Sequence, residues 1–146
     1  MTVEVNYVGV VLAAASSLAV GYIWYAPKVF GNRWSKLTGV TQGQLKKGMV
    51  RPLLIMVAAS LITAYILAHV TFLAHDFFRN SFLQDAVTTA FWLWLGLAAM
   101  RLLAHDVFER RPTQLTLINV ANDFTTIIAM GVVIGLAGTG VAPVVA

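Results

Sequence analysis

Four long apolar segments constrain this chain more than any other feature of its sequence. They cover approximately residues 7–25, 52–73, 82–104 and 113–137. Each is close to the roughly 20 apolar residues that a helix needs to cross a bilayer. Hydrophobic residues make up 59% of the sequence and charged residues 11%, whereas a soluble domain usually carries about 25% charged residues. We therefore expect an all-α fold, in which one domain of residues 1–146 forms an integral membrane four-helix bundle.

The positive charges of the loops are distributed asymmetrically. Of the ten Lys and Arg residues, six lie between the first two segments and two lie between the last two. Arg79 alone occupies the remaining loop, and Arg101 lies inside a segment. The positive-inside rule places both basic loops in the cytoplasm, with the N- and C-termini outside. We expect the inner (plasma) membrane of a bacterium. The same rule accounts for the net charge of +4, so nucleic acid is not an expected partner.

The first basic loop contains the pattern of a short amphipathic helix. Phe30, Trp34 and Leu37 recur at i, i+4 and i+7, and the basic residues lie off that stripe. We expect this helix to lie at the membrane interface, with its basic side toward anionic lipids. Trp24 and Tyr25 precede it and match the aromatic belt of a membrane interface. Trp24, Tyr25, Phe30 and Trp34 are therefore predicted interface anchors.

Small residues at helical spacing predict close helix packing. The first segment carries four of them, each four residues after the last, and the fourth segment carries a pair: Gly9, Ala13, Ser17 and Gly21, then Gly131 and Gly135. Such stripes let neighbouring backbones approach closely within a membrane. Four short helices enclose little volume, so we expect a homo-oligomer. One stripe would serve within the subunit and the other between subunits.

A polar face interrupts the fourth segment. Asn119, Asn122, Asp123 and Thr126 follow one another at i, i+3, i+4 and i+7 on one side of a helix. An ionised Asp near mid-bilayer costs about 2.5–3.5 kcal/mol on insertion scales unless it is paired, protonated or hydrated. Arg101, on the inner half of the third segment, lies level with Asn119. Two interpretations stay open: an Arg101–Asp123 pair that fixes helix register, or a hydrated cavity for an ion, a proton or a small polar solute.

Other polar residues have simpler explanations. Asp85 lies near the start of the third segment, where its charge favours the helix dipole. His105 and Glu109 have a spacing that can bind zinc, but no third ligand is visible, so a solvated histidine is favoured. No nucleophile set, phosphate loop or haem-type pair is evident, and we expect no cofactor and no metal. An enzyme is the least favoured class.

One short sequence recurs. Residues 73–78 read Leu-Ala-His-Asp-Phe-Phe, and residues 103–108 read Leu-Ala-His-Asp-Val-Phe. The predicted topology places the two copies on opposite sides of the membrane. Inverted duplication occurs in membrane transporters, but a match this short favours chance.

Two blocks of sequence resemble the DUF1761 family of small bacterial four-helix membrane proteins. The first is Gly-Tyr-Ile-Trp-Tyr-Ala-Pro-Lys-Val-Phe-Gly at 21–31, and the second is Trp-Leu-Gly-Leu at 94–97, with Phe-Glu-Arg-Arg-Pro at 108–112. The resemblance implies the four-helix architecture, and no activity. Asn122-Asp123-Phe124 departs from the aromatic and uncharged polar residues that the resemblance leads us to expect, so any role of Asp123 is particular to this chain.

Taken together, these features favour a small oligomeric channel or transporter that uses the polar face of the third and fourth segments. The alternative is a structural or accessory membrane subunit whose basic loop binds lipid or a partner.

The predicted orientation is testable by labelling, because the sequence contains no cysteine. The single-cysteine variant Ser35→Cys should react in intact cells only with a membrane-permeant thiol reagent. Modification by an impermeant reagent applied from outside would place the first basic loop on the opposite side.

Overall fold

Four helical stretches are long and apolar enough to cross a membrane. The computed structural model describes residues 3–41, 43–44 and 49–139, and these contain helices and no strands. The stretches are Tyr7–Trp24, Val50–Phe78, Phe82–Phe108 and Thr113–Ala137. The first, second and fourth are helices α1, α4 and α7. The predicted all-α fold with four such helices is confirmed.

The third stretch is a composite helix. It consists of α5 (Phe82–Leu93), the π-helical segment η2 (Trp94–Ala99) and α6 (Met100–Phe108). Both this stretch and α4 extend beyond the predicted ends at residues 104 and 73. The apolar pattern stops there, but helical backbone hydrogen bonds do not depend on side-chain polarity. Helix α4 ends only at Arg79, whose left-handed backbone (φ 59°) terminates it.

A short helix follows α1, as the amphipathic pattern predicted. The π-helical turn η1 (Pro27–Gly31) leads into α2 (Asn32–Thr38). Gly31 is required in this turn, because a Cβ there would collide with the Tyr25 carbonyl. The rings of Phe30 and Trp34 pack on Trp24 and Tyr25, at centroid distances of 4.7 and 5.5 Å. The aromatic anchors thus hold α2 to the end of α1, and its depth in a membrane stays a prediction.

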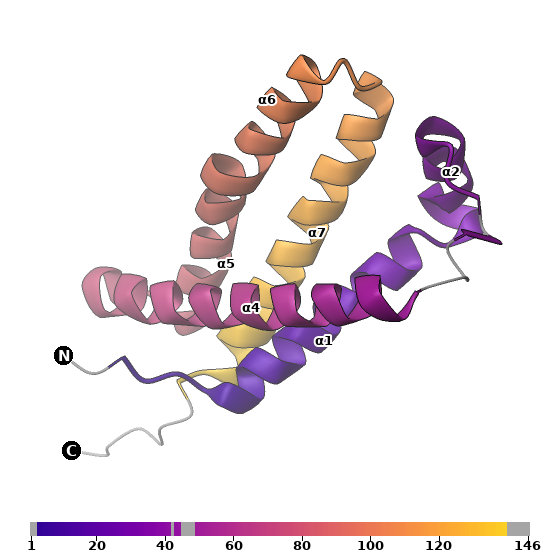
Figure 1. Ribbon diagram of the computed structural model, residues 1–146. Coiled ribbons are helices and arrows are strands. Elements are labelled where there is room, and N and C mark those ends of the chain that lie inside the picture. The colour runs from indigo at the N-terminus through magenta and orange to yellow at the C-terminus, as the bar shows by residue number, and fades with distance from the viewer. Residues whose placement is uncertain (1–2, 42, 45–48, 140–146) are drawn as a thin grey trace, which may run out of the picture.

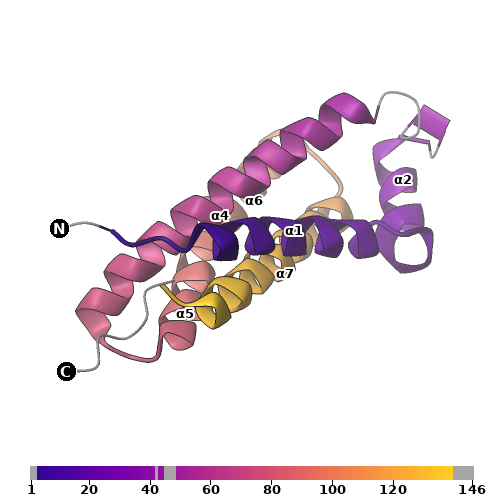
Figure 2. The same cartoon turned by 90° about the horizontal axis from the view of Figure 1, so that it is seen from below.

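The helices pack tightly at one end of the bundle. Figures 1 and 2 show the start of α1 and the end of α7 at the same end as the α4–α5 turn. We call this the outer end, after the predicted orientation, and the end with α2 and the α6–α7 turn the inner end. Six of the ten residues in the main buried cluster are alanines, and the cluster draws on all four stretches: Val10, Ala13, Ala14, Ala64, Leu67, Ala68, Ala86, Ala90, Met130 and Ile134.

The small-residue stripes are used within this single chain. A Cβ on Gly131 would lie 2.9 Å from the Ala90 Cβ, and one on Gly135 would lie 2.7 Å from the Leu83 Cα. A Cβ on Gly9 would lie 2.8 Å from the Ala137 Cβ. Ala13 is fully buried, and the Ser17 hydroxyl donates to Ser60 Oγ at 2.8 Å.

The expected use of one stripe between subunits stays a prediction. Both stripes contact helices of the same subunit. Gly21 is the exception within its stripe, because a Cβ added there would meet no described atom within 4 Å. It therefore takes no part in close packing within the subunit.

Asn6 links the start of α1 to the end of α7. Its side-chain carbonyl accepts from the Gly9 N–H at 3.1 Å, and its amide donates to the Ala137 carbonyl at 3.0 Å. One side chain thus pairs with a backbone N–H at the start of α1 and a backbone carbonyl at the end of α7, both of which lack a partner within their own helix. This contact fixes the antiparallel pairing of the two helices at the outer end.

Helix α4 leaves the bundle toward the inner end. Figure 1 shows α4 diverging from α6 and α7 toward its N-terminus. Apolar side chains near that end of α4 are exposed in the single chain, including Val50, Leu54 and Ile55. This half of α4 therefore presents an apolar surface that the subunit itself does not cover.

Close packing of α5 on α7 predicts a contrast between two glycines. Gly131→Ala should destabilise the protein by about 1–3 kcal/mol, because the new methyl group overpacks against α5. Gly21→Ala meets open space and should be neutral or stabilise by up to about 1 kcal/mol through helix propensity. Thermal unfolding in one detergent measures both, and equal midpoints for the two variants would contradict the packing.

Candidate functional site

The polar face of α7 points toward the interior of the bundle. Asn119, Asp123 and Thr126 follow Leu115 at steps of four, four and three residues, and Met130 and Ile134 continue the same stripe at steps of four. Leu115, Met130 and Ile134 are buried. The stripe is therefore the core-facing side of α7, and it is polar through its middle section.

Arg101 and Asp123 are not paired. In the described part of the chain, ion pairs join His75 to Asp85, Arg79 to Asp76, and Arg111 to both Glu109 and Asp106. Arg101 is exposed and takes part in no hydrogen bond to the polar face. It follows the π-helical segment η2, whose wider turn changes the direction of the residues after it relative to a regular α-helix. The predicted direct pair is therefore wrong, and Asp123 is half-buried without a cationic partner among the described residues.

Tyr25 joins the polar face from α1. Its hydroxyl donates to Asn119 Oδ1 at 3.2 Å. Burial, and then the charge of the Asp123 carboxylate, raise the pKa of the Tyr25 phenol to about 12. Tyr25 was predicted as an interface anchor only, and its contact across 94 residues of sequence could not be read from helical spacing.

Trp94 approaches α7 from the opposite flank. Its indole Nε1 donates to the Val120 carbonyl at 3.3 Å, and its ring packs edge-on against Phe124 at 4.7 Å. Trp94 is the first residue of η2, so the π-helical segment lies beside the polar face. On the same face of α7, the side-chain oxygen of Asn122 is buried without a hydrogen-bond partner in the described structure.

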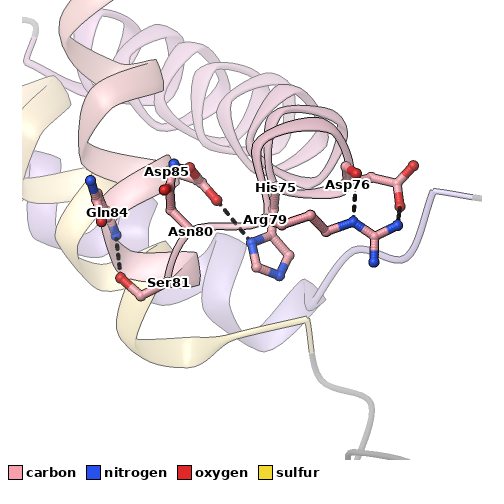
Figure 3. A network of polar contacts seen from close by, with 7 residues as sticks. All are labelled: His75, Asp76, Arg79, Asn80, Ser81, Gln84 and Asp85. Atoms are coloured by element: carbon pink, nitrogen blue, oxygen red, sulfur yellow. Dashed lines mark hydrogen bonds and ion pairs between the residues drawn. The ribbon is translucent and has the colours of Figure 1, made fainter.

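A second polar cluster closes the α4–α5 turn (Figure 3). The Asp85 carboxylate is buried, with one oxygen 2.9 Å from His75 Nδ1 and the other accepting from Asn80 Nδ2 at 2.9 Å. Arg79 folds back on Asp76 and donates to its carbonyl at 2.8 Å. Ser81 caps α5 by accepting from the Gln84 N–H. Asp85 thus does more than favour a helix dipole, because it holds the turn between two helices.

A third cluster closes the α6–α7 turn. Asp106 is buried and accepts from the Thr116 hydroxyl at 2.6 Å, and Arg111 Nε lies 3.7 Å from it. Arg111 also binds Glu109 at 2.6 Å. Within the described residues, no group of three or more His, Asp or Glu side chains is placed to hold a metal ion.

The recurring Leu-Ala-His-Asp sequence marks both turns. In each, a side chain of the last helical turn contacts the residue ten positions later on the next helix, His75 with Asp85 and Asp106 with Thr116. Each turn also contains an arginine in the left-handed region, Arg79 and Arg110. His75 is the third residue of its copy and Asp106 the fourth of its own, so the two contacts do not use equivalent positions of the repeat. Its origin by chance stays a prediction.

Family comparison agrees with this architecture. Residues 8–135 match the family described as "Protein of unknown function (DUF1761)". The chain belongs to the DUF1761 family. This confirms the resemblance of the two sequence blocks, and the match includes nearly all of the four stretches of this DUF1761 protein that are long and apolar enough to cross a membrane. Comparisons with curated proteins and with solved structures gave no match.

The cluster at the α4–α5 turn predicts unequal effects for two nearby carboxylates. Asp85→Ala should destabilise the protein by about 2–5 kcal/mol, because it leaves His75 and Asn80 without their buried partner. Asp76→Ala removes an exposed pair and should cost about 0–1 kcal/mol. Thermal unfolding in detergent tests the difference. A small loss for Asp85→Ala would mean that the buried carboxylate does not hold the turn.

Proposed function

We propose that this DUF1761 protein is a small oligomeric membrane protein that passes an ion or a small polar solute along the polar face of α7. The observation that carries the proposal is the position of Asp123. It lies on the core-facing stripe, is half-buried, and has no ion-pair partner in the described structure.

The energetics of a carboxylate in a membrane support this proposal over a structural role. An intramembrane Asp that fixes helix register would be paired or fully hydrogen-bonded, because an isolated charge is costly there. Asn122 adds a buried oxygen without a partner among the described residues. Polar groups that face the interior and lack an ion-pair or hydrogen-bond partner are expected where water or a solute passes.

Figure 1 shows the inner half of α4 diverging from α7, and apolar side chains of this half, among them Val50 and Leu54, are exposed in the single subunit. The exposed apolar side chains of α4 are suited to contact lipid or a second copy of the chain. We propose that a homo-oligomer completes the wall that a single subunit lacks.

A structural or accessory role is the second candidate, and one contact favours it. Arg33 Nη2 donates to Gln114 Oε1 at 3.0 Å, which ties α2 to the start of α7. This brings the described basic residues of η1 and α2, Lys28, Arg33 and Lys36, to the same end as Arg110 and Arg111. Such a surface would bind anionic lipids at the cytoplasmic face, about 1 kcal/mol for each basic residue near the membrane.

Flux measurements on reconstituted protein decide between the two candidates. Proteoliposomes with an imposed K⁺ gradient should show flux above that of empty liposomes, and Asp123→Asn should lower it roughly tenfold, the ratio that corresponds to about 1.4 kcal/mol. Arg101→Met is the matched control, because it removes an exposed intramembrane charge and should leave flux near wild type. Wild-type flux equal to that of empty liposomes, for K⁺ and for a panel of small polar solutes, would favour the accessory role.

A further inference from the structure

Asp123 is bordered by an aromatic residue on each flank of α7. Seen down the helix axis at about 100° per residue, Asp123 lies about 40° from Asn119 and about 100° from Phe124. The Asn119 side is bound by Tyr25 of α1, and the Phe124 side is packed by Trp94 of η2. Around the axis of α7, Asp123 therefore lies between Asn119, which Tyr25 contacts, and Phe124, which Trp94 packs against.

Both aromatic residues are held in place by hydrogen bonds within about one turn of Asp123. Tyr25 binds Asn119, four residues before it, and Trp94 binds the carbonyl of Val120, three residues before it. Packing fixes them further, since Trp34 lies against Tyr25 and Phe124 against Trp94. Both side chains are half-buried, so part of each ring remains uncovered in the subunit.

The charge balance of this region calls for a cation. Asp123 is the only ionisable residue of α7, from Thr113 to Ala137. Like any tyrosine phenol, Tyr25 carries no charge at neutral pH. Arg101, the one basic residue within the membrane-crossing part of the third stretch, is exposed and unpaired with Asp123 in the described structure. An ionised Asp123 thus leaves one uncompensated negative charge on the interior face.

The chemistry of the surroundings selects among cations. Ca²⁺ takes six to eight oxygen ligands and Mg²⁺ a near-octahedral set. Helix α7 offers one carboxylate, that of Asp123, and the polar side chains of one face. It contains no second acidic residue. Aromatic faces beside a carboxylate instead suit an organic ammonium ion, which gains from cation–π attraction and tolerates incomplete hydration.

We propose that the solute recognised at this face is a small monovalent organic ammonium ion, bound by Asp123 between Tyr25 and Trp94. This inference rests on the proposed transport function and names the substrate class for the same face. Asp123 supplies the countercharge, and the two rings supply the apolar and quadrupolar walls.

Binding to the purified full-length chain tests the substrate class. Isothermal titration in detergent at fixed pH and ionic strength should show tetramethylammonium and ethylammonium binding more tightly than K⁺ or Na⁺. Asp123→Asn should weaken ammonium binding roughly tenfold or more, and Tyr25→Leu roughly two- to tenfold through loss of the ring. Tyr25→Phe keeps the ring and should stay within about twofold of wild type. Asp76→Asn, an exposed carboxylate outside the site, should not change the affinity.

Each alternative has its own result. Stronger binding of K⁺ than of either ammonium ion, or equal ammonium affinity in Asp123→Asn and wild type, would overturn the substrate class. Variants whose size-exclusion profile and circular dichroism match those of the wild type are folded. Trp94→Phe is a second variant that keeps an aromatic ring at the site. Asp123-dependent K⁺ flux without ammonium binding would reject the ammonium ion and retain the pathway. Ammonium binding without flux of any cation would instead reject the pathway.

Discussion

Close approach of helices through alanine and glycine is the interaction on which the rest of this structure depends. The buried cluster of the outer end is built mainly from alanine side chains, and Gly131 and Gly135 let α7 lie against the backbone of α5. Within a membrane, helices gain little from hydrophobic burial, because lipid is as apolar as they are. Van der Waals contact between small residues then determines which helices touch. Asn6 reinforces this arrangement by capping α1 and α7 together.

Burial along the core-facing stripe of α7 is uneven. The stripe is buried at Met130 and Ile134, half-buried at Asn119 and Asp123, and buried again at Leu115. The polar residues therefore occupy a half-buried section between two buried ends of the stripe, and the proposed pathway rests on this section.

Buried polar groups in this chain fall into two classes. Asp85 and Asp106 are enclosed and satisfied by partners on the next helix, so they act as clamps for the two helical turns. Asp123 is less enclosed and has no cationic partner among the described residues. A buried carboxylate with partners on the next helix stabilises a fold, whereas one without a countercharge on an interior face has affinity left for a cation. This contrast separates the candidate site from the structural clusters.

The sequence by itself determined the four apolar stretches, the short helix after the first of them, and the shared face of Asn119, Asp123 and Thr126. These follow from hydropathy and from periods along one helix, which are local properties. Only the tertiary structure decided that both small-residue stripes pack within one chain, that Tyr25 binds Asn119, and that Arg101 is exposed and forms no ion pair with Asp123. Those outcomes depend on how the helices pack against one another. The spacing of residues along one helix does not predict which neighbouring helix packs on each of its faces. That packing depends on contacts between residues far apart in the chain.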